Sequence, residues 1–192
     1  MKKLTLAVLA VFIASAAFAG NWGLGLKLGG GQNDPKTLKD MHTSGELDEG
    51  YGFFSIEGQY EAEMTETGRL GVRLGIDSYG DNELKIGAVK TTESTYGIPL
   101  TLYYRWDNGI KGWSYYAGVG ATYIRTEVEQ GSWDDHKSKI FPHVVGGVEY
   151  RFTQLFALGV EAKYNIAAKV EKDGYKTDRS GISGALVGRF YF

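Results

Sequence analysis

Histidine and charged side chains are the groups in this 192-residue chain that could do chemistry. The chain has three His and no Cys, which excludes thiolate metal sites, cysteine nucleophiles and disulfides. His42, His136 and His143 lie far apart and lack the spacing of a metal site or a catalytic triad. We therefore expect no catalytic residue, no metal site and no cofactor, and interpret His143 as a hydrogen-bonding residue.

Acidic and basic residues instead recur at alternate positions over most of the chain. If strands bring these positions to one enclosed face, opposite charges should pair there, because an unpaired buried charge is costly. The sequence thus predicts a network of paired charges. Its expected members are Lys27, Glu57, Glu61, Arg69, Arg73, Asp77, Arg105, Glu149, Arg151, Glu161, Lys163 and Arg189.

The alternation that places these charges also defines eight candidate strands. In each segment one face is apolar and carries no formal charge, while the opposite face is polar, and this period of two indicates β-strands. Ile124, Phe141 and Val145 depart from the pattern, because they fall on the polar side. The segments are Trp22–Gly29, Phe53–Met64, Arg69–Asp77, Thr95–Arg105, Trp113–Ile124, Ile140–Phe152, Leu155–Ile166 and Gly181–Phe192.

The connections and the aromatic residues indicate which face points outward. Long polar connections (30–52, 78–94, 125–139 and 167–180) alternate with short ones (65–68, 106–112 and 153–154). Aromatic residues gather at both ends of the apolar faces, as they do at the two interfaces of a membrane. We therefore predict an all-β, eight-stranded antiparallel up-and-down transmembrane β-barrel of the outer-membrane type. A soluble barrel with its apolar face inside is the alternative.

The N-terminal segment, residues 1–19, reads MKKLTLAVLAVFIASAAFA and is typical of a secretory signal peptide. Its apolar run is shorter than the roughly 20 residues of a membrane-spanning helix, which disfavours an uncleaved anchor. We expect cleavage after Ala19, followed by a barrel domain of residues 20–192. The chain should then lie in the bacterial outer membrane with both termini in the periplasm. Its formal net charge of −2 argues against a nucleic-acid partner.

Several motifs together resemble a family of small outer-membrane β-barrels from Gram-negative bacteria. The motifs are IPLTLYYR at 98–105, YAGVG at 116–120, GGVEYRF at 146–152 and RFYF at 189–192. The family includes the outer membrane protein A barrel domain, outer membrane protein W and the opacity-type proteins. The resemblance implies a C-terminal assembly signal read by the barrel-assembly machinery. The residues of this signal would be Leu186, Gly188, Phe190 and Phe192.

The resemblance also implies contact with outer-membrane lipids and lipopolysaccharide, and possible contact of the loops with a host surface or a phage. We expect a structural or surface-interaction role, with long extracellular loops and a polar, largely plugged lumen. The alternative is a narrow porin-like channel for ions or small apolar solutes, because many inward positions are Gly. A lipid-modifying enzyme is less favoured: the lipid A deacylases carry His-x-Ser at the lipid-facing surface, whereas His143 has inward parity and is followed by Val145.

Overall fold

The computed structural model describes residues 22–32, 50–86, 89–107, 111–130, 133–172, 175–178 and 180–192. The expected signal peptide and its cleavage site after Ala19 lie outside these ranges. So do His42 and most of the first expected long connection. No helix in the described part of the chain is long and apolar enough to cross a membrane.

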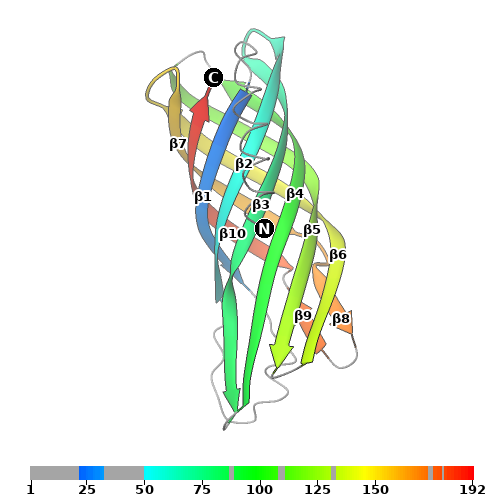
Figure 1. Cartoon of the computed structure of the whole chain (residues 1–192). Coiled ribbons are helices and arrows are strands. Elements are labelled where there is room, and N and C mark those ends of the chain that lie inside the picture. The colour runs from blue at the N-terminus through cyan, green and yellow to red at the C-terminus, as the bar shows by residue number, and fades with distance from the viewer. Residues whose placement is uncertain are drawn as a thin grey trace.

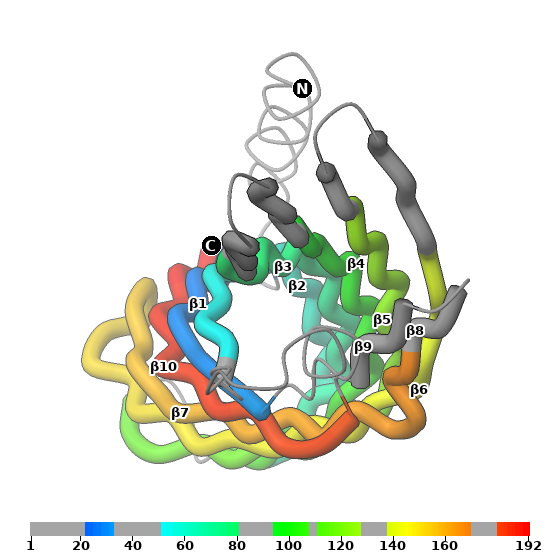
Figure 2. Tube along the Cα trace, turned by 90° about the horizontal axis from the view of Figure 1, so that it is seen from below, coloured from blue at the N-terminus to red at the C-terminus, as the bar shows by residue number. Residues whose placement is uncertain are grey.

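Eight antiparallel strands close into a barrel, in the spatial order β1-β10-β7-β6-β5-β4-β3-β2 (Figures 1 and 2). The first strand closes the ring by pairing with the last, so that Leu24 lies opposite Phe190. A separate two-stranded hairpin, β8–β9, lies in the connection between β7 and β10. The strands are β1 Trp22–Gln32, β2 Gly50–Thr65, β3 Gly68–Ile86, β4 Val89–Asp107, β5 Gly112–Gln130, β6 Trp133–Arg151, β7 Phe156–Asn165, β8 Lys169–Lys172, β9 Tyr175–Asp178 and β10 Gly181–Tyr191. The expected eight-stranded antiparallel barrel is confirmed.

The two ends of the barrel differ. We call the end where β1 begins at Trp22 and β10 ends at Tyr191 the terminal rim; it lies at the top of Figure 1. The opposite end is the distal rim. At the distal rim β3–β6, each of 19 residues, extend beyond the ring as a sheet. Pairing between β2 and β3 stops at Phe53↔Tyr79, whereas β3 and β4 stay paired to Ile86↔Val89.

The prediction of long loops at 78–94 and 125–139 was therefore wrong in extent, because most of both segments belongs to strands. The strands continue through both stretches, with a register shift in β3 between Tyr79 and Asn82, and end in the pairs Ile86↔Val89 and Gln130↔Trp133. Backbone hydrogen bonds need no apolar side chains. Alternation appears only where the two faces meet different surroundings, so it fades where a hairpin is polar on both faces. The expected loop at 167–180 likewise contains β8 and β9.

The apolar and polar faces of the strands take opposite sides of the barrel wall. Leu28 and Leu186, which form a cross-strand pair on the outer face, are each 66% exposed, whereas Arg105 and Arg189 are 0% exposed inside the ring. A water-soluble barrel has the reverse arrangement, because burial of apolar area is what stabilises it. The wall is therefore built for an apolar solvent.

Aromatic rings surround the outer wall near the terminal rim. Trp113 packs on Tyr150 with ring centroids 5.2 Å apart, and Tyr150 packs on Phe152 at 4.9 Å. The series continues around β7 and β10, where Phe156 and Phe190 are 5.1 Å apart. Such amphipathic belts mark the level where a membrane barrel meets the headgroups.

Candidate functional site: the barrel lumen

A lattice of ion pairs crosses the lumen near the terminal rim. The Arg105 guanidinium pairs with Glu149 and, through Nε, with Glu61 Oε1 at 2.8 Å. Arg189 pairs with the same Glu149 carboxylate through Nη1, and Tyr191 donates its hydroxyl to it. Five side chains from β2, β4, β6 and β10 are therefore joined, and each is almost fully buried.

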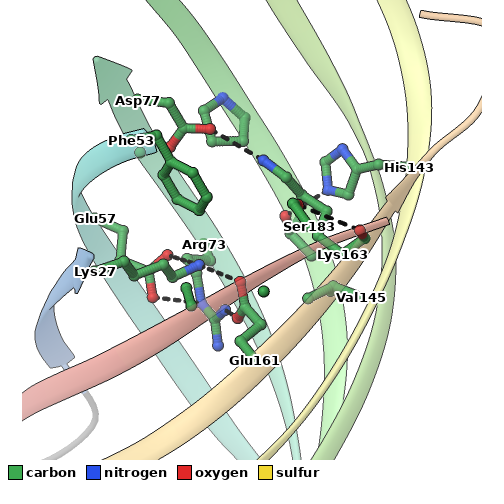
Figure 3. A pocket seen from close by; sticks show the side chains of 15 residues that line it. Lys27, Phe53, Glu57, Arg73, Asp77, His143, Val145, Glu161, Lys163 and Ser183 are labelled. Atoms are coloured by element: carbon green, nitrogen blue, oxygen red, sulfur yellow. Dashed lines mark hydrogen bonds and ion pairs between the residues drawn. The ribbon is translucent and has the colours of Figure 1, made fainter. Parts of the chain in front are cut away.

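A second group of charges lies on the distal side of the first, at the middle of the barrel (Figure 3). Lys27 Nζ is 2.6 Å from a carboxylate oxygen of both Glu57 and Glu161. Arg73 bridges the same two carboxylates, at 3.1 Å from Glu57 and 2.7 Å from Glu161. Arg189 Nη2 reaches Glu57 at 3.1 Å, so that this one guanidinium joins the two groups.

A third group lies toward the distal rim. Lys163 Nζ is 3.0 Å from Asp77 Oδ2. His143 is 1% exposed, and both of its ring nitrogens are hydrogen-bonded: Nε2 lies 2.9 Å from Thr101 Oγ1 and Nδ1 lies 3.0 Å from Thr122 Oγ1. The imidazole is thus held inside the lumen by two threonines.

The structure places every member of the expected charge network on the inner side of the wall, and each of them except Arg151 forms at least one ion pair with another inward charge. Arg69, at the terminal rim, lies 3.4 Å from Glu63 and 3.5 Å from Asp107. The Arg151 guanidinium instead stacks on the Tyr191 ring, 3.9 Å from its centroid. We call the connected set of paired inward charges the ionic lattice.

Two inward tyrosines also donate hydrogen bonds to the carboxylates of the lattice, although the sequence prediction included charged residues only. Tyr103 donates to Glu61 at 2.7 Å, and Tyr116 donates to Glu161 at 2.8 Å. The guanidinium of Arg73 lies 4.5 Å from the centroid of the Tyr103 ring, within the range of a cation–π contact. Their inward position could have been predicted from the alternation, because both tyrosines fall on the polar faces of their strands.

Between the lattice and the distal rim, the inner face becomes apolar. Ile124 and Phe141, which had departed from the alternation, are 1% and 2% exposed there, and Val145 packs nearer the terminal rim against Tyr103 and Tyr116. The departures therefore mark internal packing and not a weaker strand. We call this cluster the outer aromatic layer; it consists of Tyr51, Phe53, Tyr79, Ile124, Phe141 and Ala168.

A small cavity separates the ionic lattice from the outer aromatic layer (Figure 3). Phe53 lines it on one side and Glu57 and Glu161 on the other, and its volume is about 10 Å³. A cavity of roughly 10–15 Å³ on this measure is needed to hold one water molecule. The space left between the layers is therefore about one water in size.

A closed barrel with an apolar outer wall, aromatic belts and charges turned inward defines the class of outer-membrane β-barrels. Residues 4–190 match the model of the family described as outer membrane protein beta-barrel domain, and the chain belongs to this family. Its place in the bacterial outer membrane follows from this membership. The soluble-barrel alternative is thereby excluded.

Solved structures of similar fold serve different functions. Neisserial surface protein A shares 17% identity over 90% of this chain and 96% of that chain, with a TM-score of 0.56. The attachment invasion locus protein Ail of Yersinia pestis shares 13% over 90% and 99%, with a TM-score of 0.51. The outer membrane enzyme PagL shares 10% over 87% and 97%, with a TM-score of 0.50.

At these identities the likeness shows the fold alone. It includes an attachment protein and an enzyme, so the fold does not choose between activities. A comparison with curated protein sequences found no significant match. Any functional conclusion therefore has to come from the lumen, the wall and the rims of this chain.

Proposed function

We propose that this chain is a structural or surface-interaction protein of the outer membrane whose lumen is closed to ions and solutes. The observation that carries the proposal is the ionic lattice: Arg105, Glu149, Arg189 and Glu57 are linked by successive ion pairs across the lumen and are each at most 2% exposed. A bore that conducts needs a continuous path of water, and these side chains occupy the path.

The energetics of buried charge support a lattice that stays shut. Removing one partner of a buried ion pair costs about 3–5 kcal/mol, because the other charge is left uncompensated in a poor solvent. Moving Arg189 aside would break its contacts with Glu149 and Glu57 together. The cavity of about 10 Å³ also supports a plugged lumen over the alternative of a narrow channel.

A non-enzymatic role is supported by the placement of His143. Its two ring nitrogens are occupied by Thr101 and Thr122 inside the lumen, where a lipid substrate at the outer wall is out of reach. In the described ranges, no group of three or more His, Asp or Glu residues is arranged to hold a metal ion. His143 is therefore not placed to act as a general base for lipid chemistry at the outer wall.

The orientation we propose places the distal rim outside the cell and both termini in the periplasm. The three connections at the terminal rim, between β2 and β3, β4 and β5, and β6 and β7, are all short, whereas β3–β6 and the β8–β9 hairpin extend away at the distal side. Outer-membrane barrels keep short turns in the periplasm and longer elements outside. Lipopolysaccharide would then surround the distal wall, and the loops would meet a host surface or a phage.

The C-terminal strand supports the proposed contact with the barrel-assembly machinery. Leu186 and Phe190 are exposed on the outer wall of β10, at 66% and 43%, and Phe192 is 49% exposed at the terminal rim. These side chains are therefore accessible to a protein partner before lipid covers them. Signal-peptide removal after Ala19 would expose the start of β1 at the same rim.

Liposome swelling tests the closed lumen. Vesicles containing the refolded protein are diluted into isotonic solutions of small sugars or amino acids, with an established porin as the positive control. We expect swelling no faster than that of empty vesicles. Rapid swelling with the smallest solutes would support the narrow channel instead.

A further inference from the structure

We propose that the lumen is closed twice, by two layers of different chemistry that seal it independently. The ionic lattice forms the first seal and the outer aromatic layer forms the second, on the distal side of the small cavity. This inference rests on the proposed function, since it concerns how a closed lumen is built. It goes further by assigning a sealing role to residues that carry no charge.

The outer aromatic layer has the packing of a core within a lumen that is otherwise polar. Tyr51, Phe53 and Tyr79 pack in a triangle, with ring centroids 5.4–6.3 Å apart. Each of the three rings is at most 8% exposed, although they lie near a rim of the barrel. Water is expelled from a narrow apolar constriction, and ions are blocked there without any opposing charge.

A strap formed by residues 166–169, between β7 and β8, covers this layer from one side. Ala168 is 2% exposed and packs into the layer. Lys139 of β6 holds the strap in place through two hydrogen bonds. Its Nζ donates to the Lys169 carbonyl oxygen at 2.6 Å and to the Ala167 carbonyl oxygen at 3.4 Å. The Ile166 backbone N–H also donates to the Pro142 carbonyl at 2.9 Å.

Ala167 shows that the strap follows a specific path. Its φ of +52° is in the left-handed region, which is unfavourable for a residue with a Cβ, and it is the one described non-glycine residue with positive φ. The backbone must turn sharply there to send Ala168 inward. The contacts of Ala168 and Lys139 therefore hold the chain in a conformation that an unconstrained loop would avoid.

The outer aromatic layer contacts inward charges beside the cavity, at the Lys163–Asp77 pair. Lys163 lies 5.8 Å from the centroid of the Phe53 ring, and Tyr79 donates to Asp77 at 3.2 Å. The cavity lies on the terminal-rim side of these contacts, and the paired charges of Glu57, Glu161 and Arg73 line its far side. Opening the aromatic layer should thus admit small molecules to the cavity and no further.

The cavity offers a place for a chemical probe, because the natural chain contains no Cys. Ser183 lines the cavity together with Phe53 and Glu161 and is 3% exposed. Ser183→Cys changes little in volume and puts a single thiol between the two layers (Figure 3). Its rate of reaction with a small neutral methanethiosulfonate reports whether the cavity is reached.

The test combines Ser183→Cys with Phe53→Ala and Phe141→Ala. We expect the thiol to react at least about tenfold faster than in Ser183→Cys alone, because the apolar constriction is widened. The same variant should pass no current in a planar bilayer, because the ionic lattice remains. The matched control replaces the neighbouring lipid-facing residues, Phe54→Ala and Ile140→Ala, which are 46% and 67% exposed, and should change neither measurement.

Two results would overturn the second seal: fast labelling of Ser183→Cys alone, or slow labelling after the aromatic residues are truncated. Current through the truncated variant would overturn the independence of the two seals, because it would show that the ionic lattice does not close the lumen by itself. Current through the wild-type protein would instead overturn the closed lumen itself, so the two failures are distinguishable. Heat-dependent gel mobility verifies that each variant is folded. If the double truncation fails to fold, Phe53→Ala alone is measured against Phe54→Ala with the same expected contrast.

Discussion

Arg189 of β10 and Glu57 of β2 form an ion pair at 3.1 Å across β1, the strand that lies between them. This contact spans the place where the first strand of the barrel meets the last. The other end of the same guanidinium pairs with Glu149 of β6. The Arg189 side chain therefore stabilises, from inside the lumen, the junction between the first and last strands that closes the barrel.

Arg189→Ala should lower the free energy of unfolding by about 3–5 kcal/mol, because it leaves Glu57 and Glu149 with less compensation in the interior. Reversible urea unfolding in lipid vesicles measures this change. The control is Arg125→Ala, which removes a pair with Glu127 whose Arg side chain is 33% exposed. An exposed pair contributes only about 0–1 kcal/mol. Equal costs at the two positions would contradict the bracing role.

Leu74 is 49% exposed on the outer wall, at a position we expect near the middle of the bilayer. Leu74→Arg should therefore lower the free energy of unfolding by about 2–4 kcal/mol. The control is Ser78→Arg, on the same face of β3 but nearer the distal rim. There the cost should fall to about 0–1 kcal/mol. Unfolding in vesicles again gives the values, and a cost that does not depend on depth would count against the proposed position of the membrane.

Two glycines should respond oppositely to Ala. A Cβ at Gly118, on the inner face, would lie 2.6 Å from the Leu102 carbonyl oxygen, whereas a Cβ at Gly184, on the outer face, meets nothing within 4 Å. Gly118→Ala should therefore cost about 1–3 kcal/mol through overpacking. Gly184→Ala should be nearly neutral. The folded fraction on a gel without heating compares them, and an intolerant Gly184 would show that something contacts the outer wall there.

Lys139→Met should loosen the strap while leaving the barrel intact. It removes two hydrogen bonds to strap carbonyls, each with a net contribution of about 0.5–1.5 kcal/mol. Hydrogen exchange of the Ile166 amide should speed up, whereas exchange in β1 and β10 should not change. Unaltered exchange at Ile166 would mean that Ala168 alone holds the strap.

Parity sorted the residues of each strand into two faces, because the period of a strand forces alternate residues to opposite sides. The connection lengths and the aromatic residues then predicted which face points outward, and so placed Arg105 and Arg189 inside and Leu74 and Leu186 outside. The strand ends were less predictable. Residues such as Asn82 and Glu129 lie in paired strands, although their polar neighbours had suggested a loop.

The partners within the lumen could not be predicted, because they depend on the stagger of the whole barrel. Arg189 meets Glu149 only when β7 lies between β10 and β6 in the observed register. The outer aromatic layer was missed for a different reason. Ile124 and Phe141 were interpreted as imperfect alternation, whereas they belong to one buried cluster inside a lumen that changes from polar to apolar along its axis.

Single-channel recording of the wild-type protein tests the closed lumen most directly. The refolded barrel is inserted into a planar bilayer in concentrated salt, and insertion is verified independently by its heat-dependent gel mobility. The ionic lattice and the outer aromatic layer predict a silent membrane, without discrete current steps at moderate voltage. Regular steps whose number rises with the amount of inserted protein would contradict the account.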